Sequence, residues 1–200
     1  MIATPEAVLD YWFGAPGSAH EITARQSKLW FGKLPEKDRE VSEHFMPTFN
    51  AAITGSLDDW AATPRGRLAL VIVLDQFPHH VHRDTPDAFA QDAKAQALSL
   101  AAMATGEDKT LTLIERVFLY LPLEHAESLA MQDLAIVQYQ QLVDEAVESE
   151  RALFANFLDY AHKHRDVVLR FGRFPHRNDI LGRPSTADEI EFLKQPGSRF

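Results

Sequence analysis

The feature that most constrains this chain is a recurring helix-start signal, a threonine followed either by proline or, three positions later, by glutamate. These residues satisfy, or do without, the backbone N–H groups that a helix leaves unpaired in its first turn. Helix starts are predicted at Thr4–Pro5, Thr63–Pro64, Thr85–Pro86, Thr112–Glu115 and Thr186–Glu189. The first helix is expected to end at Gly14, and the third to run from Pro86 to Gly106. The chain is therefore expected to be mainly helical.

Hydrophobic spacing supports the same prediction over the second half of the chain. Apolar and aromatic residues recur there at three- and four-residue steps, which places them on one face of a helix. One such stripe comprises Leu153, Phe157, Tyr160, His164, Val168 and Phe171, and another comprises Leu129, Ile136, Tyr139, Val143 and Ala146. Residues 15–62 are less regular, and Pro47 is expected to kink or divide a helix that contains Val41 and Phe49.

The apolar run "LALVIVL", residues 68–74, fits either a buried strand or a buried helix. A lone strand would have no partner in this chain, so a central helix buried on all sides is expected. With 46% hydrophobic residues and no linker or low-complexity tract, residues 1–200 are interpreted as a single all-α domain. About eight helices are expected, in antiparallel pairs that form a compact bundle.

Composition and charge exclude several classes of function. The absence of cysteine excludes disulfides, thiolate metal sites and a cysteine nucleophile. A formal net charge of -9 argues against a nucleic-acid or anionic-membrane partner. Glu6 and Asp10 stand where a signal peptide needs a basic start, and no apolar run is long enough to span a bilayer. A soluble, cytoplasmic protein is therefore expected.

Two segments share an order of features: "VIVLDQFPHHVHRDTPDAF", residues 71–89, and "VVLRFGRFPHRNDILGRPSTADEI", residues 167–190. In each, an apolar helix precedes Phe-Pro-His, a polar loop, an arginine and a new helix start. A degenerate internal repeat and chance similarity both explain this likeness. Each proline is expected to end its helix, which would place the following cations beside unpaired carbonyl groups and give them a purely structural role.

Three arginines of the second segment, Arg173, Arg177 and Arg183, have no local acidic partner. Guanidinium groups match the oxygens of carboxylates and phosphates, so two interpretations remain open. In the first interpretation, the arginines form a structural network with Glu124 and Glu127. These two residues follow a helix that Pro122 is expected to interrupt. Alternatively, they form a pocket for an anionic ligand.

The candidate functional residues follow from these two segments and from "LPLEHAES", residues 121–128. Acid–base catalysis would fall to His125, His176 or Glu124, with Asp75 as a further candidate. The predicted ligand contacts are His79, Arg83, Glu127, Arg173, Arg177, Asn178 and Trp30. Trp30 lies between two lysines in a stretch without clear periodicity, where it either covers the core or lines a pocket mouth. The histidine spacing does not match a metal motif, so no metal or cofactor is expected, although a site built from His79, His82, His125, His176 and carboxylates is a weak alternative.

Four stretches, "QSKLWFGK", "ALVIVLDQFPH", "FLYLPLEHAES" and "RFGRFPHRNDILGRPST", together resemble the bacterial family called domain of unknown function 924. The resemblance extends from "VLDYWFG" to "EIEFLK". It implies a wholly helical fold similar to tetratricopeptide-like right-handed superhelices, and it implies no activity. Where the family pattern has "DQFPRN", this chain has "DQFPHH", so His79 replaces an arginine and its charge would depend on pH. Two functions remain: a polar site for a small anionic ligand or substrate, or a scaffold that binds a protein partner.

Overall fold

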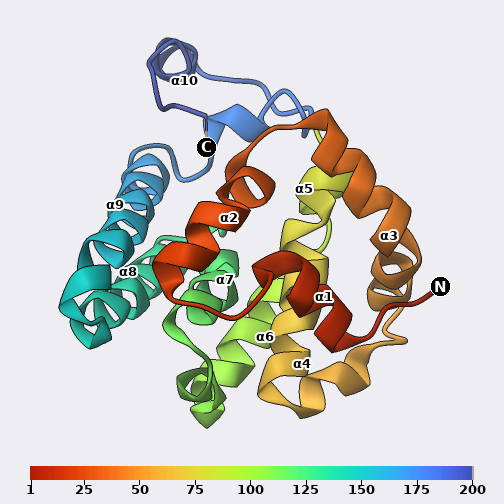
Figure 1. The fold of residues 1–200 in the computed structure, drawn as a ribbon. Coiled ribbons are helices and arrows are strands. Elements are labelled where there is room, and N and C mark those ends of the chain that lie inside the picture. The colour runs from red at the N-terminus through yellow and green to blue at the C-terminus, as the bar shows by residue number, and fades with distance from the viewer. Residues whose placement is uncertain (200) are drawn as a thin grey trace.

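The computed structural model describes residues 1–199, and within them it contains helices and no strands (Figure 1). The α-helices are α1 (Pro5–Phe13), α2 (Ala19–Phe31), α3 (Pro35–Ile53), α4 (Pro64–Val71), α5 (Pro78–Val81), α6 (Asp92–Thr105), α7 (Leu113–Glu124), α8 (Leu129–Glu145), α9 (Glu148–Phe171) and α10 (Ala187–Phe192). Shorter elements are η1 (Asp58–Ala62), η2 (Ile72–Gln76), η3 (Pro86–Phe89), η4 (Glu107–Thr110) and η5 (Pro175–Arg177). The predicted all-α fold is confirmed.

Four of the five predicted helix starts are confirmed. The Thr4 hydroxyl accepts a hydrogen bond from the N–H of Ala7, and Thr63 caps α4 in the same way. Reciprocal capping boxes begin α7 at Thr112 and α10 at Thr186. The helix predicted from Pro86 to Gly106 is wrong in extent. A short 3₁₀ turn, η3, comes first, and α6 begins only at Asp92.

The prolines interrupt helices less than the sequence predicts. Pro47 lies inside α3 and Pro122 inside α7, and both helices continue through them. Pro78 begins α5, one residue after η2, so the helical path from α4 does not end there. Helix α9 ends at Gly172, which is left-handed (φ 71°), before its proline is reached. In α7 every residue from 114 to 124 is buried, and this packing offsets the hydrogen bond lost at Pro122.

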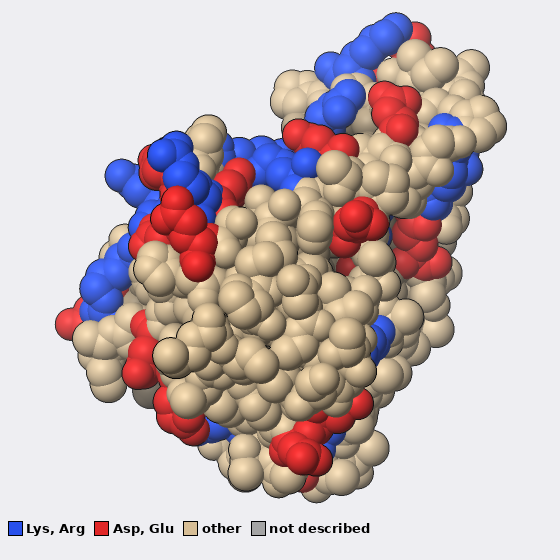
Figure 2. Space-filling view, turned by 90° about the vertical axis from the view of Figure 1, so that its right-hand side faces the viewer, with Lys and Arg blue, Asp and Glu red and all other residues tan. Residues whose placement is uncertain are grey.

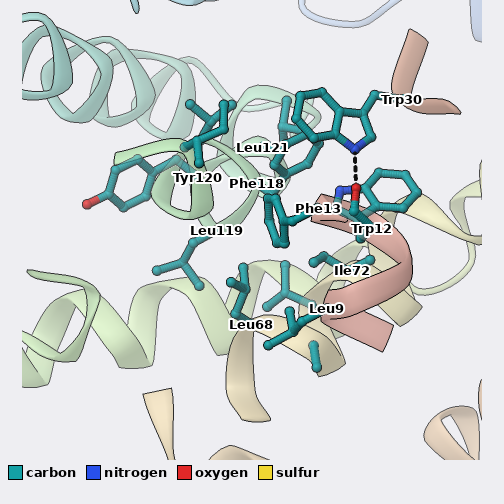
Figure 3. Close-up of a cluster of buried hydrophobic side chains, with 14 of the residues drawn as sticks. Leu9, Trp12, Phe13, Trp30, Leu68, Ile72, Phe118, Leu119, Tyr120 and Leu121 are labelled. Carbon is teal, nitrogen blue, oxygen red and sulfur yellow. Dashed lines mark hydrogen bonds between the residues drawn. The ribbon is translucent and has the colours of Figure 1, made fainter. Parts of the chain in front are cut away.

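The hydrophobic core surrounds α4, η2 and α7 (Figure 3). Residues 68–74 are fully buried and helical, which confirms the prediction of a central helix and excludes the strand. Aromatic rings of α1 and α2 pack on Phe118 of α7, and the indole Nε1 of Trp30 donates a 2.9 Å hydrogen bond to the carbonyl oxygen of Trp12. Trp30 therefore belongs to a regular helix and to the core.

The C-terminal half forms a layer in which α8 packs against both α7 and α9. The connection between α8 and α9 is only residues 146–147, so the two helices are antiparallel neighbours. Residues 182–199, here called the C-terminal arm, project beyond the helical body and carry α10 (Figure 1). Figure 2 shows this projection at the upper right, above a face whose centre lacks charged side chains. No helix within residues 1–199 has the length and apolar character needed to cross a bilayer.

Candidate functional site

An open cleft of about 480 Å³ lies where η3 and α6 meet the connection between α7 and α8. Its walls combine apolar and polar side chains from segments far apart in the sequence. They are Pro86, Phe89, Ala90, Asp92, Ala93, Gln96, Pro122, His125, Ala126, Glu127, Ser128, Arg177 and Leu181. This volume lies within the range of sites for small molecules.

His125 stands at the C-terminal end of α7 and is held there by a buried carboxylate. Its Nδ1 lies 2.9 Å from Oδ1 of Asp75, and Oδ2 of Asp75 accepts a 2.6 Å bond from the side-chain amide of Gln76. Asp75 is fully buried in η2, a π-helical turn of the kind often found at functional sites. The pair leaves Nε2 of His125 as the ring nitrogen that can meet a ligand.

Burial alone would lower the pKa of His125, but the charge and hydrogen bond of Asp75 outweigh it and raise this pKa. The pKa of Asp75 is lowered, because the His125 cation overcomes the cost of burying the carboxylate. The two shifts favour an imidazolium–carboxylate pair.

His79 packs edge-on against His125, with ring centroids 5.5 Å apart, and against Phe89 at 5.6 Å. Burial and the neighbouring His125 lower the pKa of His79 to about 3. His79 is therefore neutral at physiological pH, and the prediction of a pH-dependent charge at this position is not supported. Its ring forms a neutral packing surface behind His125.

Arg177 reaches the cleft from η5 and is buried. One amino group donates to Oδ2 of Asp92 at 3.2 Å and the other to the carbonyl oxygen of His125 at 3.0 Å. Its guanidinium carbon lies 4.4 Å from the ring centre of Phe89 and 4.8 Å from that of Phe174, which are cation–π distances. Burial lowers the pKa of Arg177. Arg177 and His125 thus present two cationic groups at one site.

Asp92, at the first position of α6, places a carboxyl in the same wall. Burial and the nearby Asp75 charge raise its pKa to about 6. Oδ1 of Asp92 and Nε of Arg177 are both buried and have no hydrogen-bond partner among the described residues. The ion pair between these two side chains is therefore incompletely satisfied.

The other predicted arginines are engaged with carboxylates outside this pair. Arg83 makes two bonds of 2.6–2.7 Å to Asp38, and Arg173 makes two of 2.7–2.8 Å to Glu189. Arg183 makes two of 2.6–2.8 Å to Glu127. Of the predicted network with Glu124 and Glu127, the structure therefore has the Arg183–Glu127 pair, whereas Arg173 bonds Glu189 instead. Asn178 is fully buried and joins that network, because its side-chain oxygen accepts from Nε of Arg183.

The other predicted site residues, Glu124, His176 and Trp30, do not line the cleft. Glu124 is paired with His164, whose Nδ1 lies 2.9 Å from Oε1 of Glu124, so it is not the partner of His125. His176 packs on Phe174, with ring centroids 5.7 Å apart, and does not line the cleft. Burial and Arg177 lower the pKa of His176 to about 3, which keeps it neutral. Trp30 lies in the core and is also outside the cleft wall.

Of the predicted site residues, the structure brings His79, His125, Glu127 and Arg177 together, and it adds Asp92 and Phe89, which the sequence analysis missed. Asp92 could have been found from its residue type, because an acidic residue is favoured in the first turn of a helix. Placing a helix start at Asp92 would have predicted η3 and α6 as two elements in place of one long helix. Within residues 1–199 no group of three or more histidine or acidic side chains is arranged to hold a metal ion.

The chain belongs to the bacterial family of proteins of unknown function DUF924, whose model matches residues 8–197. The resemblance drawn from the four sequence stretches is thereby confirmed. A protein of unknown function from Agrobacterium tumefaciens has a similar solved structure, with 33% identity and a TM-score of 0.80. That similarity covers 95% of this chain and 96% of the other. No curated protein matches the chain.

Proposed function

We propose that the cleft binds a small molecule that carries an anionic group, and that His125 exchanges a proton with it. The observation that carries this proposal is that His125, whose ring is held by the buried Asp75, lines the cleft together with Arg177. A buried carboxylate that orients an imidazole, beside a guanidinium that attracts an anion, is an arrangement suited to acid–base chemistry.

The direction of proton transfer follows from the charge on His125. Asp75 raises the pKa of His125, which favours the form that carries a proton on both ring nitrogens. Nδ1 is turned toward Asp75, so the proton on Nε2 is the one available to a ligand. His125 would therefore act first as an acid and afterwards as a base.

The cleft also has the surface that a small organic molecule needs. Phe89, Pro122 and Leu181 give it apolar walls, while Gln96 and Ser128 supply further polar groups. A molecule with an anionic end and an apolar body would bury both against matching surfaces.

The alternative, a scaffold for a protein partner on a tetratricopeptide-like superhelix, has less support. Large exposed apolar side chains are spread over the N-terminus, α2, α3, the α8–α9 hairpin and α10. They are Met1, Ile2, Phe31, Ile53, Leu129, Val137, Val147, Tyr160, Leu169 and Ile190. Partner-binding surfaces usually present contiguous apolar area, so the cleft is the better-supported site.

The test is a thermal-shift screen of purified protein against carboxylate and phosphorylated metabolites. A ligand at about one hundred times its Kd adds about 2.7 kcal/mol, which is roughly 5 to 10 °C in a chain of this size. We expect a shift in the parent and in Arg165→Met, whose arginine pairs with Asp133 outside the cleft wall, and no shift in Arg177→Met. Equal shifts in all three proteins, or none in the parent, would contradict the proposal.

A further inference from the structure

The Arg177–Asp92 pair differs from the pairs that Arg83, Arg173 and Arg183 form in how completely it is made. It rests on one 3.2 Å contact, whereas Arg83, Arg173 and Arg183 each form two contacts of 2.6–2.8 Å with a carboxylate. Each member of the cleft pair also keeps one buried atom without a partner. A ligand can therefore separate this pair at lower cost than any of the other three.

Arg177 is held in place independently of Asp92. The carbonyl oxygen of His125 accepts one of its N–H groups, and the rings of Phe89 and Phe174 hold its guanidinium plane. If the Asp92 contact is broken, Arg177 therefore remains where it is, with donors free for another acceptor. Asp92 in turn is left with two free oxygens and needs a donor.

The charges of the site restrict what can enter. Asp75, Asp92, His125 and Arg177 together are neutral when both carboxyl groups are ionised and His125 is protonated. Well above pH 6, a simple anion that takes Arg177 would leave Asp92 charged, poorly solvated and unpaired beside the anion, which is costly. A ligand that carries a cation next to its anion would satisfy both halves of the broken pair and leave the net charge unchanged.

We propose that the ligand is a small zwitterion of the α-amino-acid type, which separates Arg177 from Asp92, with its carboxylate on Arg177 and its ammonium group on Asp92. This proposal rests on the proposed function, because it concerns the same cleft and the same anion-binding arginine. Phe89, Pro122 and Leu181 in the cleft wall favour an apolar side chain on the ligand.

The pH dependence of binding separates a zwitterion from a simple anion. The groups that act on Asp92 are Asp75, Arg177 and His125, and the pKa of Asp92 is about 6. An ammonium group needs Asp92 ionised, so a zwitterion binds better above pH 6. A simple carboxylate is repelled by ionised Asp92, so it binds better below pH 6.

The experiment compares apolar amino acids with their deaminated analogues by calorimetry, for example leucine with 4-methylpentanoate and phenylalanine with 3-phenylpropanoate. At pH 8 we expect at least one amino acid to bind at least tenfold more tightly than its analogue. In Asp92→Asn this preference is expected to disappear, while Arg165→Met keeps it. Arg177→Met is expected to lose both kinds of ligand.

Three outcomes would overturn the zwitterion proposal. They are equal binding of analogue and amino acid to the parent at pH 8, a preference that persists in Asp92→Asn, and an amino-acid panel that does not bind at all. In each case binding of some other anion that depends on Arg177 would leave the proposed function standing. If no anion binds in an Arg177-dependent manner, the proposed function fails as well.

Discussion

An arginine faces a carboxylate in two regions of the molecule. The two ion pairs differ in how many of their hydrogen bonds are formed. Where the C-terminal arm meets the body, Arg183 donates a hydrogen bond to each carboxylate oxygen of Glu127. Glu127 also accepts a hydrogen bond from the backbone N–H of Phe174. In the cleft, Arg177 touches one oxygen of Asp92 at 3.2 Å. In the first arrangement both oxygens of the Glu127 carboxylate accept hydrogen bonds. In the second, Oδ1 of Asp92 and Nε of Arg177 have no hydrogen-bond partner among the described residues.

The difference separates a stabilising contact from a site that can exchange partners. A bidentate pair with a further backbone bond resists displacement because every replacement would have to match three hydrogen bonds. A single long contact with spare atoms on both sides loses little when a ligand replaces it. The pKa values agree, since that of Glu127 is lowered despite burial, through Arg183 and the Phe174 N–H, while that of Asp92 is raised by burial and Asp75.

The largest effect is expected when the complete pair is broken. Arg183→Met leaves Glu127 charged and partly buried, and we expect the free energy of unfolding to fall by about 3 kcal/mol. Arg177→Met should cost only about 1 kcal/mol, because Asp92 can take up a proton once its partner is gone. Urea unfolding at pH 7 measures both values. Equal losses would show that the two pairs are energetically alike and would remove the comparison.

Substitution of Asp92 is expected to have a smaller effect, and to raise the free energy of unfolding where the arginine substitutions lower it. Its folded pKa of about 6 exceeds the ordinary value of 3.8, so the folded protein holds a proton more tightly than the unfolded chain. The charged carboxylate therefore costs stability above pH 6, and this cost vanishes as pH falls below about 4. Asp92→Asn should raise the free energy of unfolding by about 2 kcal/mol at pH 7.5 and by almost nothing at pH 4.

The control for this prediction is Asp38→Asn, which alters a carboxylate whose pKa is lowered by Arg83 and His80 in spite of burial. That variant should lose stability at pH 7.5, because its carboxylate stabilises the fold in the charged form. A stabilisation of both variants, or of neither, would mean that the two carboxylates do not differ as described.

The smallest effect is expected at position 79, where the ring of His79 packs edge-on against that of His125. His79→Arg would place a permanent cation against His125 and disfavour a second one, so the pKa of His125 should fall. Titration of the ring protons by NMR measures this pKa. His79→Gln, which adds no charge, should leave it nearly unchanged, and a rise in the arginine variant would contradict the proposed packing of the two rings.

Much of the fold could be predicted from the sequence because its signals are local. Threonine caps, capping boxes and the apolar stripe of α9 each act within a few residues, and the structure agrees with them. Proline was misleading at Pro47 and Pro122, where tertiary burial outweighs one lost hydrogen bond. Whether the chain is a single domain and whether its helices form a tetratricopeptide-like superhelix remain predictions.

The site could be predicted only in part, because its contacts join residues far apart in sequence. His125 and Arg177 could be selected by residue type, but which carboxylate serves which cation depends on the packing of helices. Glu124 precedes His125 in the chain, yet His125 pairs with Asp75, 50 positions away, and Glu124 pairs with His164. Arg177 likewise finds Asp92 across 85 positions. No local pattern contains this information.

The π-helical turn at Ile72–Gln76 changes which side of the helical path the residues after it face. There the N–H of Phe77 bonds to the carbonyl of Ile72, five residues back, so the turn accommodates one residue more than an α-helical turn. One residue corresponds to about 100° of rotation. Deleting a residue there would preserve a helix but swing Phe77 and His79 about a quarter turn away from the partners they now meet. A change in the length of this turn would therefore reorient every residue that follows it, whereas a substitution alters one side chain.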